Sequence, residues 1–435
     1  MRQESGSRTP KGLDIALVHW AFPPTVGGVE SYLWNCSRLL ARQGHRVTVF
    51  TGTPDARTPP GEGVEVLRHP GLDLSRATGD SAERQALRDW FRAELSEREI
   101  QLVHGHNLHH FSSAPAEALL ELRDSLGLVL MHTYHSIWRE TESVRLARPC
   151  SRFDVHFAVS EFLRQACADV LGVTCAKPMY LGIDTEPYLQ VPELVDPPEN
   201  DEAVILLPAR LIPDKGAEMA VKAMAKVIKE DLPVRPYLVL MDAPDSIDFH
   251  GEKVGFRDSV QEWVKFLPEP DRVRFERAGV DGMVDLYSRA RVVVCPSLFA
   301  EPMGLAALEA MCAARPVIAT EVGGLAEGIG EHDVSGFLVA PGDVDGLADC
   351  IVRLLRSPGL ARDVGLAARK RVREDFDLEH RRLPPLIGAY ADALRVAPRR
   401  RWPRDLLTRA VDRWGAPSRR AAQSPSPRPS GSSRS

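Results

Sequence analysis

The N-terminal half of the chain repeats one pattern: a short apolar run, a polar or glycine-containing turn, and then apolar residues at helical spacing. Short apolar runs bounded by turn residues are typical of buried strands in a parallel sheet. Helices are expected at Val29–Gln43 and Glu161–Leu171. The expected strands are Leu13–His19, Arg46–Phe50, Ile100–His104, Leu128–Thr133 and Val155–Val159. This alternation predicts a doubly wound parallel sheet with right-handed crossovers.

The same pattern restarts after a proline- and acid-rich stretch, Val191–Glu202. Further strands are expected at Ala203–Pro208, Pro236–Met241, Val273–Phe275, Val292–Cys295, Val317–Thr320 and Gly336–Val339. We therefore predict an α/β protein with two Rossmann-like domains facing each other across a cleft. Ligands of such sheets bind beyond the carboxyl ends of the strands, so the site is expected between the two domains.

These patterns divide the chain into six segments. The first and last are expected to be disordered, and a helix after the second domain is expected to pack back on the first. The predicted segments are a polar N-terminus (1–11), the first Rossmann-like domain (12–190), a linker (191–202), the second Rossmann-like domain (203–376), the returning helix (377–397) and a basic tail (398–435).

Composition places the chain among globular proteins, since 44% of its 435 residues are hydrophobic and 26% are charged. No apolar run approaches the length of a membrane span and no secretory signal is evident, so a cytoplasmic location is expected. The seven cysteines are scattered without a CxxC pair and are interpreted as reduced thiols. The net charge is −5, but residues 396–435 carry ten Arg and two Asp, which leaves an acidic body of −13. The basic tail, with Trp402 and Trp414, is a candidate for peripheral membrane contact.

The most specific stretch runs from Pro296 to Met311. It leaves a predicted strand, crosses a short loop, and is expected to enter a helix at about Pro302. The backbone N–H groups of Met303, Gly304 and Leu305 would then form an anion site suited to a diphosphate. Glu301 stands before this helix and Glu309 eight residues later. Such carboxylates can each accept hydrogen bonds from the paired hydroxyls of a hexose or a ribose.

Two further loops carry residues suited to a phosphorylated ligand. Arg210 and Lys215 follow the first strand of the second half, where both side chains can reach a diphosphate and stabilise it as a leaving group. Gly27 and Gly28 lie between the first strand and the first helix of the chain, where glycine permits close approach of the backbone to a ligand.

Histidines and other polar residues follow two strands of the first half. His106, Asn107 and His109 follow one strand, and Tyr134 and His135 follow the next. No carboxylate or cysteine nearby in the sequence completes a metal-ligand set, so no metal is expected.

Taken together, these stretches resemble the family-4 retaining GT-B glycosyltransferases, and the resemblance extends from about residue 13 to residue 395. Glu301 and Glu309 match the E-x7-E motif of that family, and the Gly27–Gly28 loop matches its Gly-Gly-Val-Glu loop. Leu181 departs from the family pattern, as do Met241–Pro244 and the segment 245–265, which leaves recognition of the nucleotide base open.

The resemblance implies a role for each matching residue. The first domain would bind the acceptor and the second the nucleotide-sugar. Glu301 would contact the donor sugar, Glu309 the ribose, and His135 the donor sugar and β-phosphate. Arg210 and Lys215 would hold the diphosphate, with the Gly27–Gly28 loop contributing from the opposite domain. His106, Asn107, His109 and Tyr134 would line the acceptor pocket.

The implied activity is front-face transfer of a hexose or N-acetylhexosamine from a nucleotide-sugar, expected to be a UDP-sugar, with retention and without a metal. Neither a cofactor nor a nucleic-acid partner is expected. The acidic body favours a small polar, cationic acceptor, and the most specific hypothesis is N-acetylglucosamine transfer to 2-deoxystreptamine, as in aminoglycoside antibiotic biosynthesis. A cell-envelope or lipid-linked acceptor is the alternative. From other classes, a non-catalytic nucleotide-sugar-binding module and a GT-B epimerase stay open.

Overall fold

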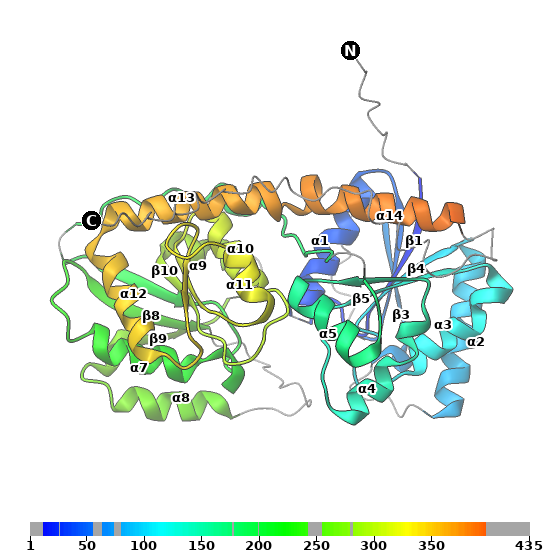
Figure 1. Cartoon of the computed structure of the whole chain (residues 1–435), viewed down its shortest axis with the longest axis horizontal. Helices are drawn as coiled ribbons and strands as arrows, with labels where there is room; N and C mark the ends of the chain where they lie inside the picture. Colours follow the sequence, from blue (N-terminus) through cyan, green and yellow to red (C-terminus); the bar gives the residue numbers. More distant parts are fainter. Residues whose placement is uncertain are drawn as a thin grey trace, which may run out of the picture.

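The computed structural model describes residues 12–25, 27–54, 63–73, 80–175, 178–198, 200–241, 255–278 and 282–396. The predicted disordered N-terminus (1–11) and the whole of the predicted basic tail (398–435) lie outside these ranges, as do residues 242–254, where the sequence departs from the family pattern. Figure 1 shows two α/β lobes side by side, linked along one edge by the C-terminal helices.

The first domain is built on a six-stranded parallel sheet in the order β3-β2-β1-β4-β5-β6. Its strands are β1 (Asp14–Val18), β2 (Arg46–Thr51), β3 (Val64–Arg68), β4 (Leu102–His106), β5 (Val129–Tyr134) and β6 (Val155–Ala158). Its helices are α1 (Gly28–Arg42), α2 (Ser81–Glu97), α3 (Ala114–Leu126), α4 (Thr141–Ala147), α5 (Glu161–Leu171) and α6 (Glu186–Leu189). Two 3-10 turns, η1 (Pro70–Leu72) and η2 (Cys150–Arg152), complete it.

A second six-stranded parallel sheet, in the order β12-β11-β10-β7-β8-β9, forms the other domain. Its strands are β7 (Glu202–Leu207), β8 (Arg235–Met241), β9 (Val273–Glu276), β10 (Ala290–Cys295), β11 (Val317–Thr320) and β12 (Phe337–Val339). Its helices are α7 (Ala217–Val227), α8 (Phe256–Lys265), α9 (Met283–Arg289), α10 (Leu305–Cys312), α11 (Gly323–Ile329), α12 (Val344–Arg356) and α13 (Pro358–Asp375), with 3-10 turns at η3 (Pro213–Lys215) and η4 (Pro270–Arg272). The predicted fold class, two doubly wound Rossmann-like domains, is confirmed.

One strand of the first sheet escaped prediction. β3 lies at the edge of the sheet, where only β2 pairs with it. Its sequence, Val-Glu-Val-Leu-Arg, is interrupted by charged residues, and none of its side chains is fully buried. An edge strand needs no continuous apolar run, so the pattern that identifies buried strands does not detect it.

The chain crosses between the domains twice, and the two crossings pair with each other. Ile183 forms an isolated bridge with Asp377, and Thr185 donates from its hydroxyl to the Asp377 carboxylate at 2.7 Å. Gly182 is packed so tightly that a Cβ there would lie 2.7 Å from the backbone of Leu378. The backbone at this junction therefore tolerates no side chain.

After the second crossing, a π-helical turn (Leu378–Arg382) leads into α14 (Leu383–Val396), which lies on the first domain (Figure 1). The hydroxyl of the fully buried Tyr390 on α14 lies 2.7 Å from Nδ1 of His104 on β4. Buried apolar side chains of the first sheet, α10 and α14 form one continuous cluster. The apolar core thus continues across the junction of the two domains. Among the described helices, none is both long enough and apolar enough to span a membrane.

Candidate active site

Helix α10 begins at Leu305, three residues after the predicted start at Pro302. The helix starts late because Gly304, its N-cap, has a φ of +81°, which breaks the helical path before it. A Cβ on Gly304 would also lie 2.5 Å from the Leu325 side chain. The first turn still leaves the N–H groups of Leu305 and Ala306 without partners in the helix, so an anion site remains, but Met303 lies outside the helix and is 2% exposed.

Glu301 lies before this helix and is paired with the lysine predicted to bind the diphosphate. Lys215 Nζ is 2.5 Å from Glu301 Oε1, and the Ser297 hydroxyl donates to the same oxygen. Glu301 is 8% exposed, so the pair lies in a poorly solvated position. The ammonium also lies 4.9 Å from the centre of the Phe299 ring. Glu301, expected to contact the sugar, and Lys215, expected to hold the diphosphate, therefore form an ion pair with each other.

Glu309 lies on α10, half-buried, beside two tyrosines. The Tyr287 hydroxyl donates to Glu309 Oε2 at 3.0 Å, and Tyr188 also hydrogen-bonds the carboxylate. Burial raises the pKa of Glu309 from 4.5 to about 7, although the two tyrosine hydrogen bonds act in the opposite direction. Near neutral pH this carboxylate is therefore poised between its charged and neutral forms.

The glycine loop of the first domain meets α10 of the second. A Cβ on Gly28 would lie 3.7 Å from the Leu305 side chain. A Cβ on Gly27 would lie 2.2 Å from Glu30 Oε2, so the loop is folded tightly over that carboxylate. The predicted motifs of the two domains thus face each other at this point.

Glu30 is one half of a buried pair that the sequence motifs did not single out. His19 Nε2 lies 3.3 Å from Glu30 Oε1, and His19 Nδ1 lies 2.7 Å from the His106 carbonyl oxygen. Burial alone would raise the pKa of Glu30, but the hydrogen bond and charge of His19, with a smaller contribution from Arg210, hold it below its ordinary value. Arg210 therefore acts electrostatically across the domain boundary.

Behind this pair, the polar residues at the ends of β4 and β5 form a buried network. His106 Nδ1 lies 2.9 Å from His135 Nε2, and Asn107 Oδ1 accepts the N–H of His135 at 2.8 Å. Burial, reinforced by repulsion from neighbouring imidazoles, lowers the pKa of His106 and His135 well below the ordinary value. Both rings are therefore neutral. His106 Nε2 and His135 Nδ1 have no hydrogen-bond partner among the described residues.

The other two residues predicted for the acceptor pocket lie deeper. His109 is 3% exposed and its Nε2 lies 3.0 Å from the Ser136 carbonyl oxygen. Tyr134 is fully buried, and its hydroxyl has no hydrogen-bond partner in the described part of the chain. Their assignment to the acceptor pocket stays a prediction.

A further contact across the domain boundary was not predicted. The Glu327 carboxylate on α11 accepts the N–H groups of Glu161 and Phe162 at 2.8 and 2.7 Å, and the Tyr180 hydroxyl at 2.9 Å. Glu327 therefore caps α5 of the opposite domain. The sequence signals were the glycines Gly323 and Gly324, which permit α11 to start against the backbone of Glu301 and Pro302.

Comparison with known proteins agrees with this geometry. Residues 195–371 match the family model described as glycosyl transferases group 1, and residues 26–187 match the model described as glycosyltransferase family 4. The crystal structure of Anabaena HepE in complex with UDP and glucose has the same fold, with a TM-score of 0.66 over 88% of this chain and 99% of that chain, at 19% identity. Fold and site thus define a GT-B glycosyltransferase.

The two family matches together cover both domains, and the chain belongs to the family-4 GT-B glycosyltransferases. Among curated relatives, glycogen synthase of Mycobacterium tuberculosis is 28% identical over 407 residues, covering 83% of this chain and 91% of the relative. A D-inositol 3-phosphate glycosyltransferase of Segniliparus rotundus is also 28% identical, over 396 residues, covering 80% of this chain and 81% of the relative.

Proposed function

We propose that this enzyme transfers a hexose or N-acetylhexosamine from a UDP-sugar to an acceptor hydroxyl, with retention of the anomeric configuration. The observation that carries the proposal is the Lys215–Glu301 ion pair, 2.5 Å apart, beside the start of α10. A ligand that offers both hydroxyls and a diphosphate can separate this pair and satisfy each partner. The complex of Anabaena HepE with UDP and glucose supports the choice of donor.

In the proposed reaction, the bond between the anomeric carbon and the β-phosphate oxygen breaks as the acceptor oxygen bonds to the same carbon from the same face. The acceptor proton passes to a phosphate oxygen of the donor, so atoms and charges balance without a metal. Lys215, Arg210 and the free N–H groups of α10 stabilise the negative charge that develops on the departing diphosphate. Glu301 orients the sugar and Glu309 the ribose.

His135 completes the site from the acceptor domain. Its ring is neutral and one ring nitrogen is unpaired among the described residues, so it is free to hydrogen-bond a sugar hydroxyl or a phosphate oxygen. A neutral ring also adds no repulsion toward a cationic acceptor. These properties support His135 as a contact to the reacting groups rather than as a proton acceptor.

For the acceptor, we infer a small, polar, cationic molecule, and 2-deoxystreptamine is the specific candidate. Similarity to relatives does not favour one acceptor, because glycogen synthase and a D-inositol 3-phosphate glycosyltransferase are both 28% identical to this chain. The charge of the chain does discriminate: the body carries about thirteen net negative charges outside its basic tail, which attracts a cation and disfavours an anionic acceptor.

The test is to incubate the enzyme with UDP-, GDP-, ADP- and dTDP-sugars and an acceptor panel that includes 2-deoxystreptamine, an inositol phosphate and a lipid-linked acceptor in vesicles. We expect UDP release matched by one glycoside product, whose anomeric configuration by NMR equals that of the donor. Inversion would contradict the mechanism. Transfer to the lipid acceptor alone would refute the acceptor assignment while keeping the reaction class.

Two outcomes would overturn the enzyme class itself. An epimerase would convert or hydrolyse the donor without any acceptor, and a binding module would bind UDP-sugar without turnover. Glu301→Gln and Glu309→Ala are expected to lose transfer, and Glu97→Ala, which removes an exposed carboxylate at the end of α2, is the matched control. Unchanged donor affinity in Glu309→Ala would contradict the ribose assignment.

A further inference from the structure

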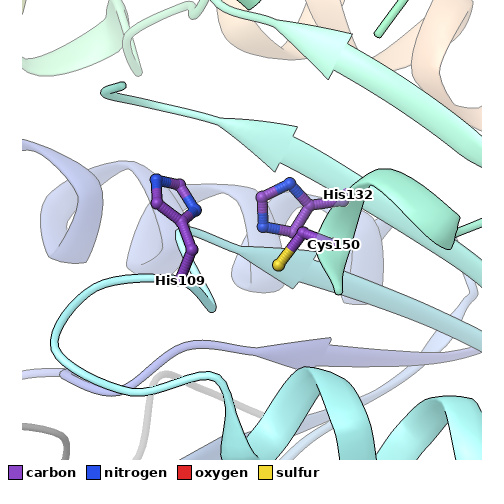
Figure 2. A group of neighbouring side chains, drawn as sticks. All are labelled: His109, His132 and Cys150. Atoms are coloured by element: carbon purple, nitrogen blue, oxygen red, sulfur yellow. The ribbon is translucent and has the colours of Figure 1, made fainter. Parts of the chain in front are cut away.

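Three potential metal ligands from separate parts of the first domain meet in its interior. His109 lies in the loop after β4, His132 on β5, and Cys150 at the start of the η2 turn. One ligand atom from each residue lies within 4.8 Å of the other two, and all three side chains are buried. Figure 2 shows the two imidazoles and the thiol converging on one space from these elements.

The hydrogen bonds of the two histidines set which ring nitrogen of each can bind an ion. His109 Nε2 lies 3.0 Å from the Ser136 carbonyl oxygen, so Nε2 carries the proton and Nδ1 keeps its lone pair. A histidine that donates its second N–H to a backbone carbonyl is the usual arrangement of a metal ligand. His132 Nε2 accepts the Leu108 N–H at 3.3 Å, so the neutral ring carries its proton on Nδ1. Binding of an ion at Nδ1 requires this proton to move to Nε2, which replaces the hydrogen bond from Leu108.

Several polar atoms in and beside this cluster are buried without a hydrogen-bond partner. His109 Nδ1, His132 Nδ1 and the Tyr134 hydroxyl are buried with no hydrogen-bond partner among the described residues. Each unsatisfied buried polar group destabilises the folded domain, because it has lost its hydrogen bonds to water. A bound ion or water is the usual explanation for such groups.

We propose that His109, His132 and Cys150 bind one zinc-like divalent cation as a structural site in the acceptor domain. Zinc takes imidazole nitrogens at about 2.0–2.1 Å and thiolate at about 2.3 Å, so tetrahedral ligand atoms lie about 3.3–3.6 Å apart. The three ligand atoms lie within 4.8 Å of one another, so side-chain shifts of about 1 Å bring them to this spacing. Binding replaces the Cys150 thiol proton, which leaves to solvent, and one coordination position remains for a water or another oxygen.

The cation would connect the interior of the domain to the candidate active site. His109 is two residues from Asn107, whose side chain holds the backbone N–H of His135 at 2.8 Å. Fixing His109 to β5 and to the η2 turn would therefore fix the loop that positions His135. The ion itself would have no part in the transfer step, and its detection does not depend on the proposed activity.

The direct test is to purify the chain without chelator, measure its metal content, and titrate the metal-free protein with Zn²⁺ and then Co²⁺. We expect one equivalent to bind, with the thiolate-to-cobalt absorption of a cysteine ligand. Cys150→Ser should abolish that absorption and weaken zinc binding about 100-fold or more, since losing an outer-shell partner alone costs 10- to 100-fold. Cys36→Ser, which changes a cysteine that is also buried but lies on α1, is the control.

A folded wild-type chain that binds less than one equivalent, or one whose cobalt absorption persists in Cys150→Ser, would overturn the proposal. In that case, ordered water molecules would satisfy the buried polar atoms of the cluster. If Cys150→Ser fails to fold, His132→Asn provides the same comparison, and the wild-type titration decides the question without any variant.

Discussion

Glu327 is expected to hold the two domains in their catalytic arrangement, and its replacement by alanine tests this. The carboxylate accepts three hydrogen bonds, two from the first N–H groups of α5 and one from Tyr180. The next N–H of α5, that of Leu163, is capped from within its own domain by Ser160 at 3.2 Å. The capping of one helix is thus divided between the two domains.

The magnitude follows from these contacts. A hydrogen bond to a charged group contributes about 1.5–3 kcal/mol when buried, and helix capping contributes about 0.5–2 kcal/mol. Glu327 is half-buried, so we take about 1 kcal/mol for each of its three bonds. Glu327→Ala should then weaken the contact between the domains by about 2–3 kcal/mol, which corresponds to roughly 30- to 150-fold in the equilibrium between joined and separated domains.

The assay is kcat/KM for the donor, because the proposed reaction needs the glycine loop of one domain against α10 of the other. We expect a fall of roughly 10- to 100-fold in Glu327→Ala and of a few-fold in Tyr180→Phe. Ser160→Ala is the matched control, since it removes about 1 kcal/mol of capping from the same helix end, and the hydrogen bond that is lost lies within the first domain. Equal losses of kcat/KM in Glu327→Ala and Ser160→Ala would show that α5 stability, and not domain contact, is responsible.

Three further predictions concern the site itself. Lys215→Met should lower kcat more than it raises KM, because the charge of Lys215 is expected to act as the diphosphate departs. Single-turnover assays of Lys215→Met and of Arg210→Met measure this, and an effect on KM alone would contradict the assigned role. Burial raises the pKa of Glu309 from 4.5 to about 7, so the folded state resists ionisation of this carboxyl and loses stability as the pH rises through that range. Glu309→Gln removes this loss, and its free energy of unfolding should exceed that of the wild type by an amount that grows with pH to roughly 3 kcal/mol. Denaturant unfolding at each pH checks the sign. Gly27→Ala should lower the free energy of unfolding by more than 1 kcal/mol, because its methyl would collide with the Glu30 carboxylate. Gly28→Ala is the control, since its methyl meets only an ordinary contact with Leu305, and equal losses in the two variants would refute the steric argument.

The fold was largely predictable because parallel strands that are buried on both faces appear in the sequence as continuous apolar runs. The predicted and observed limits of β11 and α5 agree residue for residue. The edge strand β3 was missed because its sequence, Val-Glu-Val-Leu-Arg, has no continuous apolar run. The start of α10 was placed three residues early because proline favours a first helical turn, whereas the positive φ of Gly304, a property of the folded loop, delayed it.

The candidate site was predictable to the level of residues and not of their pairings. Motif spacing located Glu301 and Lys215, yet it could not show that they form one ion pair, because they are 86 residues apart in the chain. The same holds for Glu327, which acts on a helix start 166 residues earlier. Pairings of this kind follow from the packing of one domain on the other, which local sequence does not encode.

The same limit explains why no metal was expected from the sequence, whereas a metal site is proposed from the structure. Near the histidines in the chain, no cysteine or carboxylate completes a ligand set. Cys150 is 41 residues after His109, and only the parallel arrangement of β4, β5 and the η2 turn brings it to within 4.8 Å of both imidazoles. Ligand spacing is informative where a metal folds a short segment around itself. In a sheet that folds on its own apolar core, ligands converge from different strands, so the absence of a compact motif is weak evidence against a site.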